Sequence, residues 1–251
     1  MKTALISIEA YNIFVAYREG ASPLLCFIHG LGCDHKHYGA VWDHPAMANH
    51  AILIPDLPGY GFSSKFPEMD YSLNKMAELL HRLLHLWTSD SVVLVGHSMG
   101  GAIAQLMIQQ NPHPIAGFVN VEGNLIGADC TFSRKASQVD FSTFASLRFP
   151  ALQRAYENHP YGRSLKRSLA HTFYQQSQDL VQLSDSETLL NHFLHMSLPR
   201  VYVYGEKNRS HPVLPRLSTV SRIEIPNSGH FPMLDNPDDF FASIARAVAS
   251  F

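Results

Sequence analysis

A serine set between two glycines, where a strand pattern gives way to a helical one, constrains this chain most. The apolar run Val-Val-Leu-Val at 92–95 leads into Gly-His-Ser-Met-Gly at 96–100, and an apolar helical pattern follows. Only small neighbours permit so sharp a reversal, so Gly96 and Gly100 predict a turn that holds Ser98 in a strained backbone conformation. Such a turn exposes the Ser98 hydroxyl beside the unpaired N–H groups of a helix N-terminus. The segment predicts a strand–turn–helix unit that presents a nucleophilic serine.

Composition fits one compact protein that acts on a small molecule. The 251 residues can form one domain with an insertion, since 46% are hydrophobic and only 16% charged. A net charge of −2 without any basic stripe argues against nucleic acid or an anionic membrane surface as partner. There is no signal-peptide pattern or bilayer-spanning apolar run, and three cysteines suggest no disulfide framework. We expect a cytoplasmic monomer or homodimer with a small-molecule substrate.

Short apolar runs recur along the chain with helical patterns between them. Runs without polar alternation are typical of strands covered on both faces, and they occur at 24–28, 51–54, 92–95, 116–121, 200–205 and 222–225. An alternating segment from Leu5 to Tyr17, with a break near Asn12, predicts an antiparallel hairpin. Helices are expected over 71–87 with Ser72 as N-cap, after the serine turn as far as Asn111-Pro112, and from Pro237. This alternation predicts an α/β fold with a doubly wound, mostly parallel sheet.

One stretch, from Asn124 to Ser197, interrupts the alternation because it has no clear buried strand. It contains helix-like segments such as 186–196, so we expect a helical cap (124–197) inserted into a core formed by 1–123 and 198–251. The stretch is also rich in phenylalanine: Phe132, Phe141, Phe144, Phe149 and Phe173. These side chains predict either a partly apolar substrate pocket or the cap's own core.

Four motifs at successive strand ends give the chain a family resemblance over nearly its whole length. They are His29-Gly30-Leu31-Gly32, Asp-Leu-Pro-Gly-Tyr-Gly-Phe-Ser at 56–63, Gly-His-Ser-Met-Gly-Gly at 96–101 and Asn-Ser-Gly-His-Phe-Pro at 227–232. Each alone is weak, but in this order the chain resembles the α/β-hydrolase fold family. The resemblance implies Ser98 as nucleophile and His230 as its base. It also implies an oxyanion hole formed by the Leu31 and Met99 N–H groups.

The acid partner of the histidine departs from the common family pattern. Many members place an aspartate after the penultimate strand, where this chain has Asn208 in Gly-Glu-Lys-Asn at 205–208. An asparagine can orient a histidine but cannot stabilise its cation by charge. Other members carry the acid after the strand that follows the helix of the serine turn, and here Glu122 follows Val119-Asn120-Val121. We therefore expect a Ser98-His230-Glu122 triad, with Asn208 and Glu206 as alternatives for the third position.

Several further residues are candidates for the site. His29, Gly30, His35 and His97 flank the motifs and are possible substrate contacts. Cys33 could line the pocket without acting as a nucleophile, and the position of Cys130 at the start of the cap suggests no role. Arg134 either pairs with an acidic group or fixes the cap. His81 and His85 share a helix face and are expected to be a solvated pair, so no metal is predicted.

The expected activity is hydrolysis of an ester or thioester of a small, partly apolar substrate through an acyl-enzyme, as in a carboxylesterase. An amide or C–C bond is a less favoured target, and no metal or organic cofactor is implied. Two alternatives stay open. The loop at 32–38 bears some likeness to cofactor-free dioxygenases of the same fold, and a small-molecule receptor could retain the triad.

Overall fold

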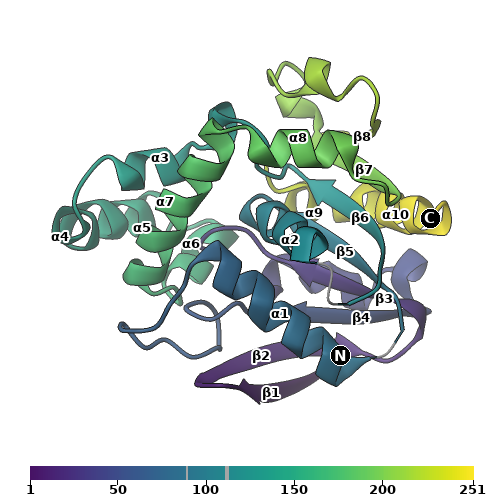
Figure 1. Cartoon of the computed structure of the whole chain (residues 1–251), viewed down its shortest axis with the longest axis horizontal. Helices are drawn as coiled ribbons and strands as arrows, with labels where there is room; N and C mark the ends of the chain where they lie inside the picture. Colours follow the sequence, from purple (N-terminus) through teal and green to yellow (C-terminus); the bar gives the residue numbers. More distant parts are fainter. Residues whose placement is uncertain (89, 111–112) are drawn as a thin grey trace.

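The computed structural model describes residues 1–88, 90–110 and 113–251 and contains one eight-stranded sheet (Figure 1). Its strands lie in the order β1-β2-β4-β3-β5-β6-β7-β8. The pairs β1–β2 and β2–β4 are antiparallel, and the other neighbours are parallel. The strands are β1 (Lys2–Ile8), β2 (Tyr11–Arg18), β3 (Ala21–Ile28), β4 (His50–Pro55), β5 (Val92–His97), β6 (Ile115–Val121), β7 (Arg200–Gly205) and β8 (Ser221–Ile225). The predicted doubly wound, mostly parallel sheet is confirmed.

The central strands form where the sequence is continuously apolar. All six residues of β5 are buried, and Val95 pairs with Phe27 on β3 and with Val119 on β6. The first hairpin reverses earlier than predicted. Its turn lies at Glu9-Ala10, where Glu9 adopts φ 53°, whereas Asn12 lies within β2. The break expected near Asn12 was therefore wrong, because the reversal uses a left-handed glutamate that no sequence pattern indicated.

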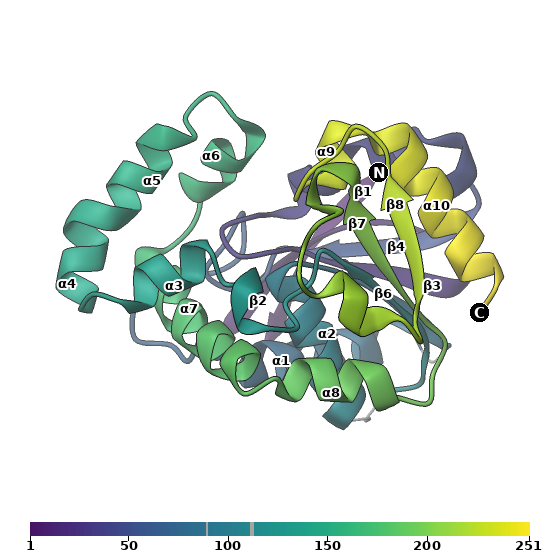
Figure 2. The same ribbon diagram turned by 90° about the horizontal axis from the view of Figure 1, so that it is seen from above.

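Helices cover both faces of the sheet (Figure 2). On one face lie α1 (Leu73–Trp87) and α2 (Met99–Gln110), and on the other lies α10 (Pro237–Ala249), preceded by the short α9 (Pro232–Asp235). The Ser72 side chain accepts a hydrogen bond from the Lys75 N–H, which confirms it as the N-cap of α1. The predicted end of the second helix at Asn111-Pro112 falls outside the described residues. No helix in the described ranges is long and apolar enough to cross a membrane.

Between β6 and β7 the described chain forms helices only. They are α3 (Phe132–Ser137), α4 (Phe141–Thr143), α5 (Phe149–Ala155), α6 (Pro160–Leu165), α7 (Ala170–Asp185) and α8 (Thr188–His195), with short 3-10 and π segments between them. The helix expected over 186–196 is α8. Helices α3 to α7 extend beyond one end of the sheet (Figure 1). Phe132 and Tyr161 of these helices line one cavity with Ser98, which places the inserted cap beside the serine turn. The exact division at 124 and 197 stays a prediction.

Candidate active site

The serine turn has the strained geometry that its glycines predict. Ser98 adopts φ 52°, and its N–H donates to the Val121 carbonyl at 2.9 Å. A Cβ on Gly100 would lie 2.1 Å from the Ile28 carbonyl oxygen, and one on Gly96 would lie 2.5 Å from the Gly100 oxygen. Because backbone occupies that space, neither position accepts a side chain. The turn therefore holds Ser98 between the end of β5 and the start of α2.

Glu122 lies at the end of β6 and faces the histidine. Its side chain is only 9% exposed, and Oε2 lies 3.5 Å from Nδ1 of His230. The Gly205 N–H donates to Oε1 at 2.7 Å, and Nδ2 of Asn208 donates to Oε2 at 2.9 Å. Asn208 thus contacts the carboxylate of Glu122. The other alternative, Glu206, accepts a hydrogen bond from the Asn227 N–H at 2.8 Å. The geometry brings Glu122 and His230 together, and Asn208 supports the acid.

His97 holds the backbone of His230 in place. The Nε2–H of His97 donates to the His230 carbonyl oxygen at 2.7 Å, and the two rings lie 4.9 Å apart. Burial, and after it the charge of His230, holds the pKa of His97 well below its usual value. His97 is therefore neutral, and its protonated nitrogen fixes the backbone that carries His230. The edge of the Phe231 ring lies against His230 at 5.2 Å.

The residues expected to form the oxyanion hole lie beside the serine. Leu31 lines the same cavity as Ser98 and His230, and Met99 is the first residue of α2. Across the described ranges, neither the Leu31 N–H nor the Met99 N–H donates a hydrogen bond. The Leu31 carbonyl accepts a hydrogen bond from the Tyr161 hydroxyl of α6 at 3.1 Å. The cap thus anchors the Leu31 carbonyl group. The Leu31 N–H has no acceptor among the described residues and is available to a ligand.

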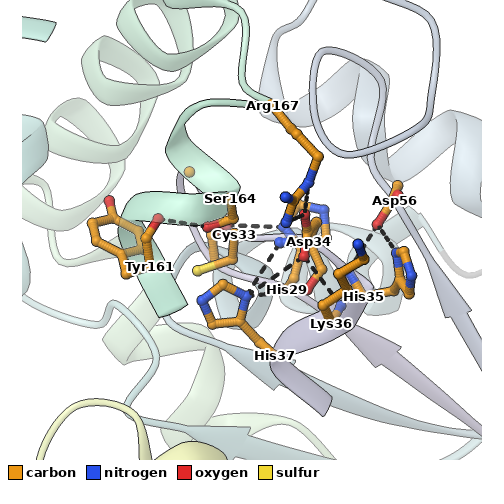
Figure 3. Close-up of polar contacts among 12 residues, drawn as sticks. His29, Cys33, Asp34, His35, Lys36, His37, Asp56, Tyr161, Ser164 and Arg167 are labelled. Atoms are coloured by element: carbon orange, nitrogen blue, oxygen red, sulfur yellow. Dashed lines mark hydrogen bonds and ion pairs between the residues drawn. The ribbon is translucent and has the colours of Figure 1, made fainter. Parts of the chain in front are cut away.

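A buried ion pair ties the loop after Leu31 to the cap (Figure 3). Asp34 is fully buried, and its Oδ2 accepts from Nε and Nη2 of Arg167 at 2.8 and 2.5 Å. Burial opposes the Asp34 charge, but His37 and Arg167 outweigh it and hold the pKa of that carboxyl well below its usual range. Sequence reasoning missed this pair because its members lie far apart in the chain and belong to no motif.

Of the other candidates, His29 and His35 do not line the catalytic cavity. Nδ1 of His35 lies 2.8 Å from Oδ1 of Asp56 (Figure 3). Nε2 of His29 accepts from the Leu57 N–H at 3.0 Å. Both histidines fix loops, whereas Gly30 and His97 do line the cavity, as does Cys33.

Three residues outside the cavity have structural partners. Arg134 pairs with Asp185 of α7, so it fixes the cap, and the Cys130 thiol donates to the Leu180 carbonyl at 3.6 Å. The expectation of a solvated histidine pair was wrong for His81, which is buried and lies 2.9 Å from the Met107 carbonyl oxygen. The described residues contain no group of three or more His, Cys, Asp or Glu side chains suited to a metal ion.

Two cavities meet at His230. The catalytic cavity has a free volume of about 30 Å³, and its lining includes Ser98 and His230. A second cavity of about 260 Å³ is lined by Glu122, Asp129, Asn208 and His211, and it shares His230 with the first. Sequence reasoning did not single out Asp129. Its Oδ2 accepts from the Leu125 and Ile126 N–H groups at 2.6 and 2.7 Å, and its Oδ1 lies 3.4 Å from Nε2 of His211. Burial raises the pKa of Asp129 despite these contacts.

The chain is similar to known proteins in its sequence and in its fold. A sequence model of the alpha/beta hydrolase family matches residues 27–244. A pimeloyl-[acyl-carrier protein] methyl ester esterase of Aeromonas hydrophila is 27% identical over 92% of this chain and 97% of that protein. A 2-succinyl-6-hydroxy-2,4-cyclohexadiene-1-carboxylate synthase of an Enterobacter species is 27% identical over 90% of this chain and 92% of that protein. Among solved structures, the N-acyl homoserine lactonase AidH complexed with N-butanoyl homoserine gives a TM-score of 0.78 at 19% identity, covering 100% of this chain and 97% of that chain.

Proposed function

The chain belongs to the alpha/beta hydrolase family, and we propose that it is a serine hydrolase that cleaves an ester or thioester of a small, partly apolar substrate. One observation carries the proposal: the strained Ser98 and His230 line one cavity, and the Glu122 carboxylate lies 3.5 Å from Nδ1 of that histidine. Serine needs a base, and the base needs an oriented anionic partner, so this convergence supplies the parts of a catalytic triad. The Aeromonas relative, named as an ester esterase, agrees with the proposed bond type.

The proposed reaction runs in two halves. His230 takes the Ser98 proton as the oxygen attacks the carbonyl carbon, and the Leu31 and Met99 N–H groups stabilise the negative charge on the carbonyl oxygen. Glu122 holds the imidazole in the required orientation and stabilises its cation. The bond to the leaving oxygen or sulfur then breaks, and His230 returns the proton to it. Water, activated by His230, attacks the acyl-enzyme and releases the acid, which restores Ser98.

The surroundings of His230 define the proposed leaving-group side. A group that receives its proton from His230 must lie within hydrogen-bond reach of that ring. The cavity beyond His230 offers the polar side chains of Glu122, Asp129, Asn208 and His211. We therefore propose a leaving alcohol or thiol with hydrogen-bonding groups of its own, taken from a free small molecule rather than from nucleic acid or a membrane. The active unit would be a monomer or a homodimer.

Labelling by a fluorophosphonate probe tests the proposal directly. The probe should attach to the wild-type protein, with the adduct located on the Ser98 peptide by mass spectrometry, and Ser98→Ala should abolish both labelling and ester hydrolysis. Ser133 lines the same cavity and serves as an internal control, since it has no histidine partner in the described structure. An adduct on Ser133, or no adduct, would refute the nucleophile. Oxygen consumption that survives Ser98→Ala would indicate the dioxygenase alternative, and tight ligand binding without turnover would indicate the receptor.

A further inference from the structure

Phe132 is placed at the junction of three cavities. It is the first residue of α3, and among the described residues it alone lines the catalytic cavity, the cavity beyond His230 and a third cavity within the cap. Its ring lies edge-on to Tyr156 at 5.6 Å and stacks on Tyr161 at 5.8 Å. This aromatic side chain therefore adjoins both the cavity of Ser98 and the space inside the cap.

The third cavity, here called the cap groove, is apolar and far larger than the catalytic cavity. Its volume is about 250 Å³, and its mainly apolar lining includes Ala136, Phe144, Leu152 and Phe173, together with Lys135 and Arg148. Phe144 and Phe173 are buried and stack on each other at 5.7 Å. The cavity beyond His230 has a mixed lining, in which Glu122, Asp129, Asn208 and His211 lie beside the rings of Phe132, Tyr156 and Phe231. The two spaces that adjoin the catalytic cavity thus differ in chemistry.

The catalytic cavity itself is narrow. Its free volume is about 30 Å³, against the roughly 10–15 Å³ that a single water needs. An acyl chain attached to the reacting carbonyl must therefore extend into a neighbouring space. The cavity beyond His230 offers polar groups that suit the leaving group. We therefore assign the apolar acyl chain to the cap groove, which Phe132 borders. Apolar chains prefer an apolar surrounding, and about fourfold in affinity is gained for each buried methylene.

We propose that Phe132 is a gate and that the cap groove is the acyl subsite, which takes an unbranched aliphatic acyl chain of medium length. This inference rests on the proposed function, because it assigns the two ends of the same ester. When the Phe132 ring turns aside, the acyl chain passes from Ser98 into the groove between α3, α5 and α7. The structure thereby assigns the substrate class: an apolar acyl group joined to a polar alcohol or thiol.

Chain-length profiles test the gate. Hydrolysis of p-nitrophenyl esters from acetyl to dodecanoyl should show kcat/KM rising with length in the wild-type protein. Leu152→Trp fills the groove and should lower the decanoyl-to-acetyl ratio of kcat/KM at least tenfold. Phe132→Ala should raise that ratio at least threefold. Leu147→Trp is the matched control, since Leu147 is 64% exposed and lies outside all three linings, and its ratio should equal that of the wild type.

The outcomes separate this inference from the proposed function. Acetyl-ester hydrolysis with an unchanged ratio in Leu152→Trp or in Phe132→Ala would overturn the acyl subsite or its gate while leaving the serine hydrolase intact. If no ester is cleaved, binding of decanoate measured by calorimetry decides instead. Leu152→Trp should weaken that binding at least tenfold relative to Leu147→Trp, and equal dissociation constants would overturn the proposal.

Discussion

At the scale of single residues, the acid is the part of the site with the most unusual arrangement. Glu122 directly follows β6, yet both of its hydrogen-bond donors, the Gly205 N–H and the Asn208 side chain, come from the end of β7 and the residues that follow. Position 208, which the family resemblance offered as another place for the acid, is thus occupied by a residue that supports Glu122. A carboxylate that is 9% exposed needs such donors, because burial without them is costly.

Removal of the Glu122 charge should be far more damaging than removal of its neighbour. Glu122→Gln should lower kcat on the order of 10⁴-fold, because the amide cannot stabilise the imidazolium. Asn208→Ala removes one donor and leaves the Gly205 N–H in place, so its loss should be at least a hundredfold smaller. The measurement is kcat for p-nitrophenyl acetate. A larger effect from Asn208→Ala would refute the assignment of the acid.

Much of the site could be predicted from the sequence because its parts lie at strand ends. Ser98, Glu122 and His230 each follow directly on a buried strand or its turn, and parallel strands bring these ends to one edge. Asp129 could not be found in this way, because its position depends on how an irregular loop folds over the cavity. His35 was expected near the substrate, but its ring binds Asp56, a partner on another loop.

At the scale of elements, the loop after β3 and the cap are joined by the Asp34–Arg167 pair. Arg167→Gln should lower the free energy of unfolding by about 3 kcal/mol, which is the lower end of the range of losses when one partner of a buried ion pair is removed. The lower end applies because Arg167 is 26% exposed and the Lys36 N–H still donates to Asp34. Arg163→Gln, at an exposed position of α6, is the matched control and should change stability little. Urea unfolding measures both, and equal values would contradict the role of the pair.

The same cluster should make stability depend on pH. The pKa of Asp34 is lowered from 3.8, so its contribution is present above that value and is lost as the pH falls below it. Burial opposes the charged form of His37, but Cys33 and Asp34 outweigh it and raise its pKa from 6.5 to about 10. That contribution is complete below pH 6.5 and disappears as the pH rises to about 10.

The stabilisation that Asp34 provides, measured against Asp34→Asn, should therefore be largest between about pH 4 and 6.5. It should shrink on both sides of that window, first by protonation of Asp34 and then by deprotonation of His37. Urea unfolding of both proteins at several pH values gives the difference in free energy. A difference that stays constant from pH 2 to 10 would show that the cluster does not titrate in this way.

The elements themselves were predicted best where one physical signal dominates. Continuous apolar runs located the parallel strands, and the serine at position 72 located the start of α1. The first hairpin was misplaced because a left-handed glutamate makes its turn. The cap helices other than α8 were not located individually, since they are short and their packing partners lie elsewhere in the cap.

At the scale of the whole molecule, the cap and one face of the core belong to a single apolar cluster. Cap residues Phe144, Phe173 and Leu189 share this cluster with Leu80 of α1 and Ile103 of α2. Elements that bury their apolar surface against each other lose it together, so they unfold as one unit. The inserted cap is therefore held to the core by apolar packing as well as by the two chain connections at its ends.

Heating should accordingly unfold the chain in one cooperative transition. The calorimetric and van't Hoff enthalpies should agree, and circular dichroism in the near and far ultraviolet should change together. A Phe173→Ala variant should lower the midpoint of that transition without splitting it, because the cluster is shared. Two resolved transitions, with the earlier one sensitive to Phe173→Ala, would show that the cap is an independent folding unit.

The arrangement of Glu122 and Asn208 also has an evolutionary consequence. Since the two side chains touch across neighbouring strands, an acid can migrate between strands by two point mutations without any change in the path of the chain. A carboxylate at position 208 would meet the carboxylate of Glu122, and two like charges so close share one proton, so the pair would still carry one negative charge. The original carboxylate could then be replaced while the site keeps an acid. The strand after which a protein carries its acid can thus reflect descent and not a difference in the reaction catalysed.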